Sequence, residues 1–278
     1  MIEIPESITI SQQAKEVLRG KVVSDVINAT SPHRFTWYNG NPERYPELLI
    51  GKKIQDIVGY GSYVDICFDK NTHLAISDGT NIRYFTTTEK CPKKFQLLVV
   101  FDDSSYLVFT VAMYGGIYAF CGDFDNSYYR GSMEKLLPLD ERFDFNFFEK
   151  MIHEVGKDIS VKALLATEQR IPGLGNGVLQ DLLFNAEINP RRRISTLSDK
   201  DRKRLFSSMK ETLSNMTDKG GRDTEKDLFG NLGGYRCILS KNTYHEPCPR
   251  CGGLIVKEAY LGGSVYYCHK CQNEEKYK

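Results

Sequence analysis

Residues 169–190 read QRIPGLGNGVLQDLLFNAEINP, a glycine-rich turn that leads directly into an apolar helical segment. Glycines at positions 173, 175 and 177 free backbone N–H groups at the predicted start of this helix, and Asn176 lies among them. Such a helix start can cradle a phosphate, because the N–H groups and the helix dipole both favour an anion. A turn of this kind is weakly specific by itself, so its interpretation depends on the rest of the chain.

The most specific pattern is a set of paired cysteines late in the sequence. Cys248 and Cys251 are followed, after sixteen residues, by Cys268 and Cys271. Four thiolates in two close pairs suit the tetrahedral coordination of Zn²⁺, so we expect one structural zinc ion in a ribbon finger. A four-thiolate iron centre and a redox dithiol are the alternatives. His269 lies inside the second pair, but four cysteines make it unnecessary as a ligand.

Composition excludes several classes of protein. The 278 residues are 41% hydrophobic and 26% charged, which is typical of a globular chain and not of a disordered or fibrous one. No apolar run approaches the roughly 20 residues that a membrane span needs. Residues 1–6 carry two acids and no basic start, so they do not resemble a signal peptide. We expect a cytoplasmic location, nucleoid-associated if the source is bacterial.

Charge is distributed unevenly along the chain. Residues 1–147 hold 15 Lys and Arg against 19 Asp and Glu, whereas residues 148–278 hold 22 against 17. The surplus is concentrated in residues 191–222, where ten cations meet four acids. This bias fits a phosphate-facing surface, and a solvated helix face is the alternative.

Hydrophobic patterning predicts a multidomain α+β chain. A helix over residues 5–19 precedes short β-branched and aromatic runs, which indicate an antiparallel β-sandwich or barrel. These runs cover residues 21–29, 53–60, 63–69, 73–77, 96–101, 106–113 and 116–121. Helices are predicted over residues 146–156, 161–167, 177–184 and 199–217, and a loop over 223–244. The predicted domains are 1–145, 146–235 and 236–278.

Together these motifs resemble the formamidopyrimidine-DNA glycosylase and endonuclease VIII family of base-excision repair enzymes. The resemblance covers nearly the whole chain and rests on residues 3–6, 73–77, 172–190 and 247–272. It implies a bilobal clamp on double-stranded DNA, with the damaged nucleotide turned out into the cleft between the lobes. It also implies that residues 172–176 belong to a helix-two-turn-helix motif in which Asn176 contacts a phosphate. We expect the chain to act as a monomer.

The family's catalytic N-terminus is altered in this sequence. The family uses an N-terminal proline as the amine that attacks the sugar, whereas Ile2 follows Met1 here. The α-amine of Met1 is the candidate replacement, because an α-amine has a pKa near 7.7–8.0 and is partly unprotonated at neutral pH. Glu3 aligns with the glutamate that acts on the deoxyribose, and Glu6 with a second acid. Ordinary acids at a helix start are the alternative for both.

The DNA-contacting positions that the resemblance implies are also altered. Ser62 replaces a strand lysine, and Ile76 replaces a methionine that fills the void in the duplex. Residues 111–116 replace a loop with an intercalating Phe and an Arg, so Met113 and Tyr114 are the candidate wedges. No cation stands at residues 262–264, where the finger would grip a phosphate. Fewer cations predict weaker binding to DNA.

Four further residues have a structural and a functional interpretation. Arg222 and Phe229 lie in the segment 220–230, which resembles the family's loop over the extruded base, although such loops are often only mobile. Trp37 is expected to pack, with base stacking as the alternative. His73 is expected to be a hydrogen-bonded core histidine, with a catalytic base as the alternative.

Three functions therefore stay open at this stage. The first is a DNA glycosylase with β-elimination (AP lyase) activity that uses the amine of Met1. The second is a catalytically impaired glycosylase scaffold that binds lesions or abasic sites in DNA. The third uses the finger and the basic helices for contacts with other proteins.

Overall fold

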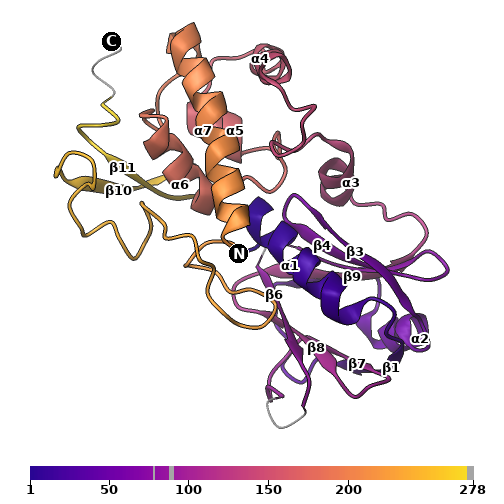
Figure 1. Cartoon of the computed structure of the whole chain (residues 1–278). Coiled ribbons are helices and arrows are strands. Elements are labelled where there is room, and N and C mark those ends of the chain that lie inside the picture. Colours follow the sequence, from indigo (N-terminus) through magenta and orange to yellow (C-terminus); the bar gives the residue numbers. More distant parts are fainter. Residues whose placement is uncertain (78, 88–90, 274–278) are drawn as a thin grey trace.

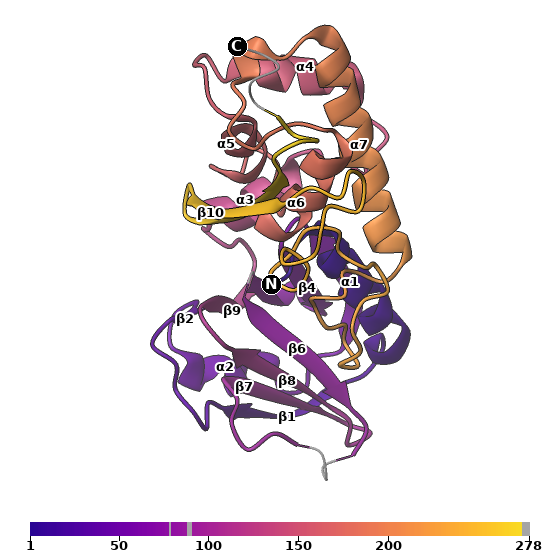
Figure 2. The ribbon, with the colours of Figure 1, turned by 90° about the vertical axis from the view of Figure 1, so that its left-hand side faces the viewer.

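The computed structural model describes residues 1–77, 79–87 and 91–273. The chain forms two lobes, one built from two β-sheets and the other from helices with a two-stranded hairpin (Figures 1 and 2). The N terminus lies where the two lobes meet (Figure 2). This arrangement confirms the predicted α+β fold with a sandwich, a helical part and a terminal cysteine module.

The first lobe is a sandwich of a four-stranded and a five-stranded sheet. The four-stranded sheet has the order β1-β7-β8-β6 and is antiparallel throughout. Its strands are β1 (Val23–Asn28), β7 (Leu97–Phe101), β8 (Tyr106–Val111) and β6 (Thr80–Phe85). The five-stranded sheet has the order β2-β9-β5-β4-β3. Its strands are β2 (Thr36–Tyr38), β9 (Gly115–Cys121), β5 (Thr72–Ser77), β4 (Tyr63–Phe68) and β3 (Ile54–Tyr60).

One strand departs from the predicted antiparallel pattern. Strand β2 pairs parallel to β9, with Trp37 opposite Gly116. Strands β2 and β6 and the helices α2 (Tyr45–Leu49) and α3 (Ser127–Glu134) were not expected from the sequence. They are short, and β6 alternates polar and apolar residues too briefly to stand out.

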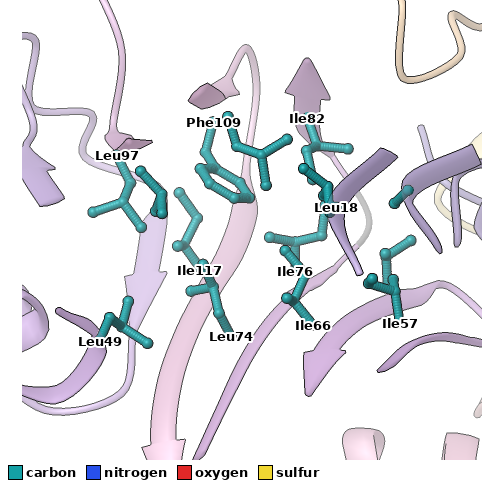
Figure 3. Packing of buried hydrophobic residues seen from close by; sticks show 14 of the residues in the cluster. Leu18, Leu49, Ile57, Ile66, Leu74, Ile76, Ile82, Leu97, Phe109 and Ile117 are labelled. Carbon is teal, nitrogen blue, oxygen red and sulfur yellow. The ribbon is translucent and has the colours of Figure 1, made fainter. Parts of the chain in front are cut away.

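The sandwich core is formed by alternate residues of facing strands. Leu74, Ile76 and Ile117 point toward Phe109 and its neighbours from the other sheet (Figure 3). The helix α1 (Ile4–Leu18) closes this core from the side of β3 and β4. It approaches closely because Gly59 has no side chain: a Cβ there would lie 2.6 Å from the carbonyl oxygen of Ser7.

Helix α1 also belongs to the second lobe. Ile10, Ala14 and Leu18 pack in the sandwich core, whereas Ile4 packs in the helical core. The helical core is built from α4 (Phe145–Glu154), α5 (Val161–Ala166), α6 (Asn176–Asn185) and α7 (Asp199–Asp218). The first residues of the chain are therefore fixed between two cores, beside the start of α6.

The antiparallel hairpin of β10 (Ile255–Tyr260) and β11 (Gly263–Cys268) lies against α6. Gln180 of α6 holds it by donating to the carbonyl of Ser264 (3.1 Å) and accepting from the N–H of Tyr266 (3.0 Å). The side chain of Gln272 donates to the carbonyl of Ile188 (2.9 Å). The cysteine module is thus attached to the helix whose start lies at the junction of the lobes.

The basic segment 191–222 is largely engaged in ion pairs. Arg192 pairs with the buried Asp201 at 2.7 Å, and Arg191 pairs with Glu258 of the hairpin at 2.7 Å. Arg202 pairs with Glu149 at 2.9 Å. These arginines join helices and the hairpin, so they contribute less to a phosphate-facing surface than the charge count suggested. None of the helices in the described residues combines the length and apolarity needed to cross a bilayer.

Candidate active site

Glu3 reaches across the junction of the lobes to the first turn of α6. Its Oε1 accepts a hydrogen bond from the N–H of Gly177 (2.9 Å), and its Oε2 accepts one from the N–H of Val178 (2.8 Å). A helix leaves such first-turn N–H groups without a partner in the helix itself. The prediction that this helix start binds a phosphate is therefore wrong for residues 177 and 178. Their N–H groups already donate hydrogen bonds to a carboxylate of the chain itself.

Arg222 lies buried between Glu3 and Glu6. Its Nε and Nη2 donate to the two carboxylate oxygens of Glu6 at 2.9 and 2.7 Å, and its Nη1 lies 3.4 Å from Oε1 of Glu3. Nη2 also lies 3.2 Å from the carbonyl oxygen of Met1. We expected Arg222 to contact an extruded base, but its side chain is only 2% exposed and points toward the two acids.

The pKa values of the two carboxyl groups are shifted in opposite directions. Burial raises the pKa of Glu3, and the charge of Arg222 only partly opposes it. Burial also disfavours the charged form of Glu6, but the charge and hydrogen bonds of Arg222 outweigh it and lower the pKa of Glu6. Neighbouring acids with divergent pKa values suit separate roles as proton donor and fixed anion.

Two glycines make this packing possible. A Cβ on Gly177 would lie 1.4 Å from Nη1 of Arg222. A Cβ on Gly175 would lie 2.6 Å from Oε1 of Glu3. The glycines of this turn therefore leave room for the buried side chains of Arg222 and Glu3, a role that the sequence did not indicate.

Met1 and Glu3 line one pocket of about 420 Å³ at this junction. The amino group of Met1 forms an ion pair with the carboxylate of Glu225, a residue that the sequence analysis did not single out. The sequence-predicted residues in this pocket are Met1, Glu3, Met113, Asn176 and Arg222. The only feature of the sequence that could have indicated a role for Glu225 was its position in the segment 220–230.

Asn176 begins α6 and faces the tip of the hairpin. A Cβ on Gly263 would lie 2.2 Å from its Nδ2. Within the described part of the chain, its buried Oδ1 has no hydrogen-bond partner. Its amide group therefore has unused hydrogen-bonding capacity at the pocket, as a ligand-contacting residue requires.

Other predicted residues lie elsewhere. Ile2 and Ile76 are buried in the sandwich core (Ile76 is labelled in Figure 3). Their burial gives both side chains a packing role, since neither is presented to a ligand. Ser62 lines a second pocket, and Phe229 is exposed with its ring against Tyr84.

Tyr114 and His73 each contact an aromatic neighbour. Tyr114 lies against Trp37 with ring centroids 5.8 Å apart, and its hydroxyl reaches the sulfur of Met1 at 3.3 Å. His73 is 3.0 Å from Asp65 and stacks on Phe120, as expected of a hydrogen-bonded core histidine. Tyr114 therefore connects the pocket of Met1 with the surface around Trp37.

The four cysteines of the finger come together at the base of the hairpin. Their sulfur atoms all lie within 4.8 Å of one another, with Cys248 and Cys271 3.8 Å apart and Cys251 and Cys268 3.4 Å apart. Zn–S bonds of about 2.3 Å in a tetrahedron place sulfurs about 3.8 Å apart. The cluster therefore has the donor set and spacing to bind a metal ion.

The chain is similar in sequence to known proteins. A family profile described as "Formamidopyrimidine-DNA glycosylase H2TH domain" matches residues 136–227. The formamidopyrimidine-DNA glycosylase of Brevibacillus brevis is 26% identical, covering 99% of this chain and all of the relative. That of Pelotomaculum thermopropionicum is 34% identical over 49% of each chain.

Solved structures show the same fold. The MutM (Fpg) protein of Thermus thermophilus superposes with a TM-score of 0.80 at 22% identity, covering 98% of this chain and 99% of that one. The Fpg of Lactococcus lactis in complex with DNA containing an abasic site gives a TM-score of 0.81 at 23% identity, covering 98% and 100%.

Proposed function

The chain belongs to the formamidopyrimidine-DNA glycosylase family, and we propose that it is a DNA-repair glycosylase that binds damaged duplex DNA. The observation that carries this proposal is the pocket shared by the amine of Met1 and the carboxyl of Glu3. A glycosylase that also cleaves abasic sites needs an amine and a proton donor beside the same sugar. Similarity along the full length to glycosylases favours this function over a scaffold that only binds DNA.

The amine of Met1 is the proposed nucleophile. In its neutral form it attacks C1′ of the damaged nucleotide, and the bond between C1′ and the base breaks. The ammonium proton must leave first, and Glu225 in contact with this amine is the nearest base to take it. The nitrogen of Met1, a primary amine, passes one proton to the departing base. The C1′–O4′ bond then breaks, O4′ takes a proton from Glu3, and a protonated Schiff base joins Met1 to the opened sugar.

Glu3 is the proposed proton donor for this step. Burial raises its pKa, so its acid form persists to higher pH than that of an exposed glutamate. Its two hydrogen bonds to α6 hold the carboxyl group in place beside the pocket. Arg222 lines the same pocket, whereas Glu6 does not, and the tight ion pair between the two positions Glu3.

DNA contacts are proposed for the residues that surround this pocket. Met113 is 69% exposed at its rim and is the proposed apolar wedge in the duplex, with Tyr114 beside it. Asn176 offers its amide group to a phosphate next to the lesion. Ser62 lines a neighbouring pocket and is 5% exposed, so we propose only an indirect part for it in binding DNA, weaker than that of the cation it replaces.

Zinc is the proposed metal of the cysteine cluster. Four thiolates leave no open coordination position, so the ion would be structural and would fix the hairpin against α6. The proposed substrate also implies a location in the compartment that holds the chromosome, which in a bacterium is the cytoplasm.

Fluorescence anisotropy with two labelled duplexes tests the proposed function. One duplex contains a tetrahydrofuran abasic-site analogue, and the other has the same sequence without damage. We expect at least about tenfold tighter binding to the damaged duplex and weaker binding to both as salt rises. Equal affinity for the two duplexes at every salt concentration would refute damage recognition.

A further inference from the structure

A second pocket of about 440 Å³ opens on the outer face of the five-stranded sheet. Four aromatic side chains line it: Trp37, Tyr63, Tyr118 and Tyr128. Tyr63 and Tyr118 are 5% and 8% exposed and form its floor, whereas Trp37 and Tyr128 are 49% and 63% exposed and form its rim. The proposed glycosylase chemistry does not use this pocket.

The floor of the pocket is held rigidly by neighbouring rings and backbone. Tyr63 packs edge-on against Tyr129, with centroids 5.4 Å apart, and Tyr118 packs against Phe124 at 5.1 Å. The ring of Tyr118 also lies over Gly116, where a Cβ would be 2.3 Å from its atoms. Because Gly116 pairs with Trp37 across the strands, the floor meets the rim at this point.

The polar groups of the pocket are neutral. Ser62, Ser77, Asn126 and Gln169 complete the lining, so hydroxyl and amide groups face the aromatic rings without any charged side chain. Oδ1 of Asn126 accepts hydrogen bonds from the N–H groups of Tyr128 and Tyr129, both at 3.0 Å, which orients its amide group. Such a lining does not suit a phosphate, because a phosphate is bound most strongly by cationic side chains. It suits a flat, uncharged ring with hydrogen-bonding edges.

The pocket lies close to the proposed DNA cleft. Gly61 and Gly173 meet backbone to backbone between the lobes, and a Cβ on Gly173 would lie 2.2 Å from the carbonyl carbon of Gly61. Ser62, the next residue, lines the aromatic pocket, whereas Gly177 lines the pocket of Met1 and Glu3. Trp37 also contacts Tyr114, whose hydroxyl reaches Met1. A duplex bound across the Met1 pocket would therefore pass beside the aromatic pocket.

We propose that this aromatic pocket binds an unpaired nucleobase of the bound duplex, distinct from the base at Glu3. This inference rests on the proposed binding of damaged DNA. Aromatic side chains stack on any base, and amide and hydroxyl groups can bond to its edges. The base can come from two places: opposite the vacated position, or next to it on the damaged strand.

Trp37 provides a direct probe, since it is the single tryptophan of the chain. Three duplexes carry the abasic analogue in the same position. In the first duplex, adenine lies opposite the analogue. In the second, a further abasic analogue lies opposite it, so no base is unpaired. The third is the second duplex with one extra, bulged adenine next to the analogue on the damaged strand. Trp37 emission is recorded at saturation, and anisotropy of labelled DNA measures binding separately.

Stacking should lower Trp37 emission roughly twofold relative to the second duplex, which has no unpaired base. A decrease with the first duplex assigns the opposite base, and a decrease with the third assigns the neighbouring one. If all three duplexes bind but emission is the same, this inference is wrong and the proposed function stands. If none binds, both fail.

Tyr128→Leu tests the pocket without using fluorescence. Loss of one stacking surface should weaken binding of the duplex that quenches Trp37 by about fivefold or more, and leave the second duplex unaffected. Phe35→Leu is the matched control, because Phe35 is as exposed as Trp37 (49%) and does not line the pocket. Equal losses for both variants, or for both duplexes, would contradict a base-binding pocket.

Discussion

The carboxylate of Glu3 accepts a hydrogen bond from the backbone N–H of Gly177 at 2.9 Å. This bond joins the first residues of the chain to the first turn of α6. Glu3 immediately precedes α1, the helix that closes the sandwich, and Gly177 lies in the first turn of α6, a helix of the other lobe. The same carboxyl group is thus a structural cap and the proposed proton donor. The lobes are connected at the point where the chemistry is proposed.

Gly177→Ala should disrupt this connection. Its Cβ would lie 1.4 Å from Nη1 of Arg222, so the buried guanidinium or α6 must move, at a cost of about 3 kcal/mol in unfolding free energy. Gly131→Ala is the matched helical control, because the nearest atom to its Cβ is 4.0 Å away. That variant should gain about 0.5–1 kcal/mol in urea denaturation. Similar effects of the two substitutions would refute the close packing.

Arg222→Met should be strongly destabilising. It leaves the buried acids Glu3 and Glu6 without their cation, and breaking such a pair costs about 3–5 kcal/mol. Adding Glu6→Gln should recover part of the loss, since it removes one unpaired charge. Arg250→Met is the control: its pair with Glu187 is exposed and should contribute less than about 1 kcal/mol. A loss for Arg222→Met no larger than that of the control would exclude the buried network.

The stability of the chain should depend on pH through Asp181. Burial raises its pKa to about 6, although it accepts hydrogen bonds from the N–H groups of Ile238 and Leu239. Because this pKa lies above the unfolded value, the stabilisation is complete below about pH 4 and is lost as pH rises through about 6. Relative to Asp181→Asn, wild type should lose about 2 kcal/mol between pH 4 and 7. Denaturation curves at several pH values measure this difference, and a difference independent of pH would contradict it.

Metal removal should loosen the hairpin from α6. Native mass spectrometry should find one zinc ion per chain, and Cys268→Ser should abolish its retention. Without the ion, the region around β10 and β11 should become sensitive to protease. Cys121→Ser is the control, because Cys121 is an exposed cysteine outside the cluster. Retention of zinc by the Cys268 variant would argue against a four-thiolate site.

Much of the fold could be predicted because its signals are local. The periodicity of α7 and the spacing of the four cysteines are visible in one stretch of sequence. The short strand β2 and the helix α3 escaped prediction because tertiary contacts, such as the pairing of Trp37 with Gly116, decide them.

The candidate site was predicted only in part for the same reason. Glu3, Asn176 and Arg222 were named, but nothing in the sequence showed that Arg222 turns inward to the acids at positions 3 and 6. The ion pair of Met1 with Glu225 joins residues 224 positions apart, a relationship that needs the folded chain.

In the proposed mechanism, the amine of Met1 and the carboxyl of Glu3 act on one sugar. Borohydride trapping on abasic-site DNA, followed by peptide mapping, detects the covalent bond that this amine would form. We predict a covalent adduct on Met1 that falls at least about tenfold in Glu3→Gln and is unchanged in Glu16→Gln, an exposed acid on α1. DNA that is bound but yields no adduct, or an adduct confined to a lysine, would contradict this mechanism.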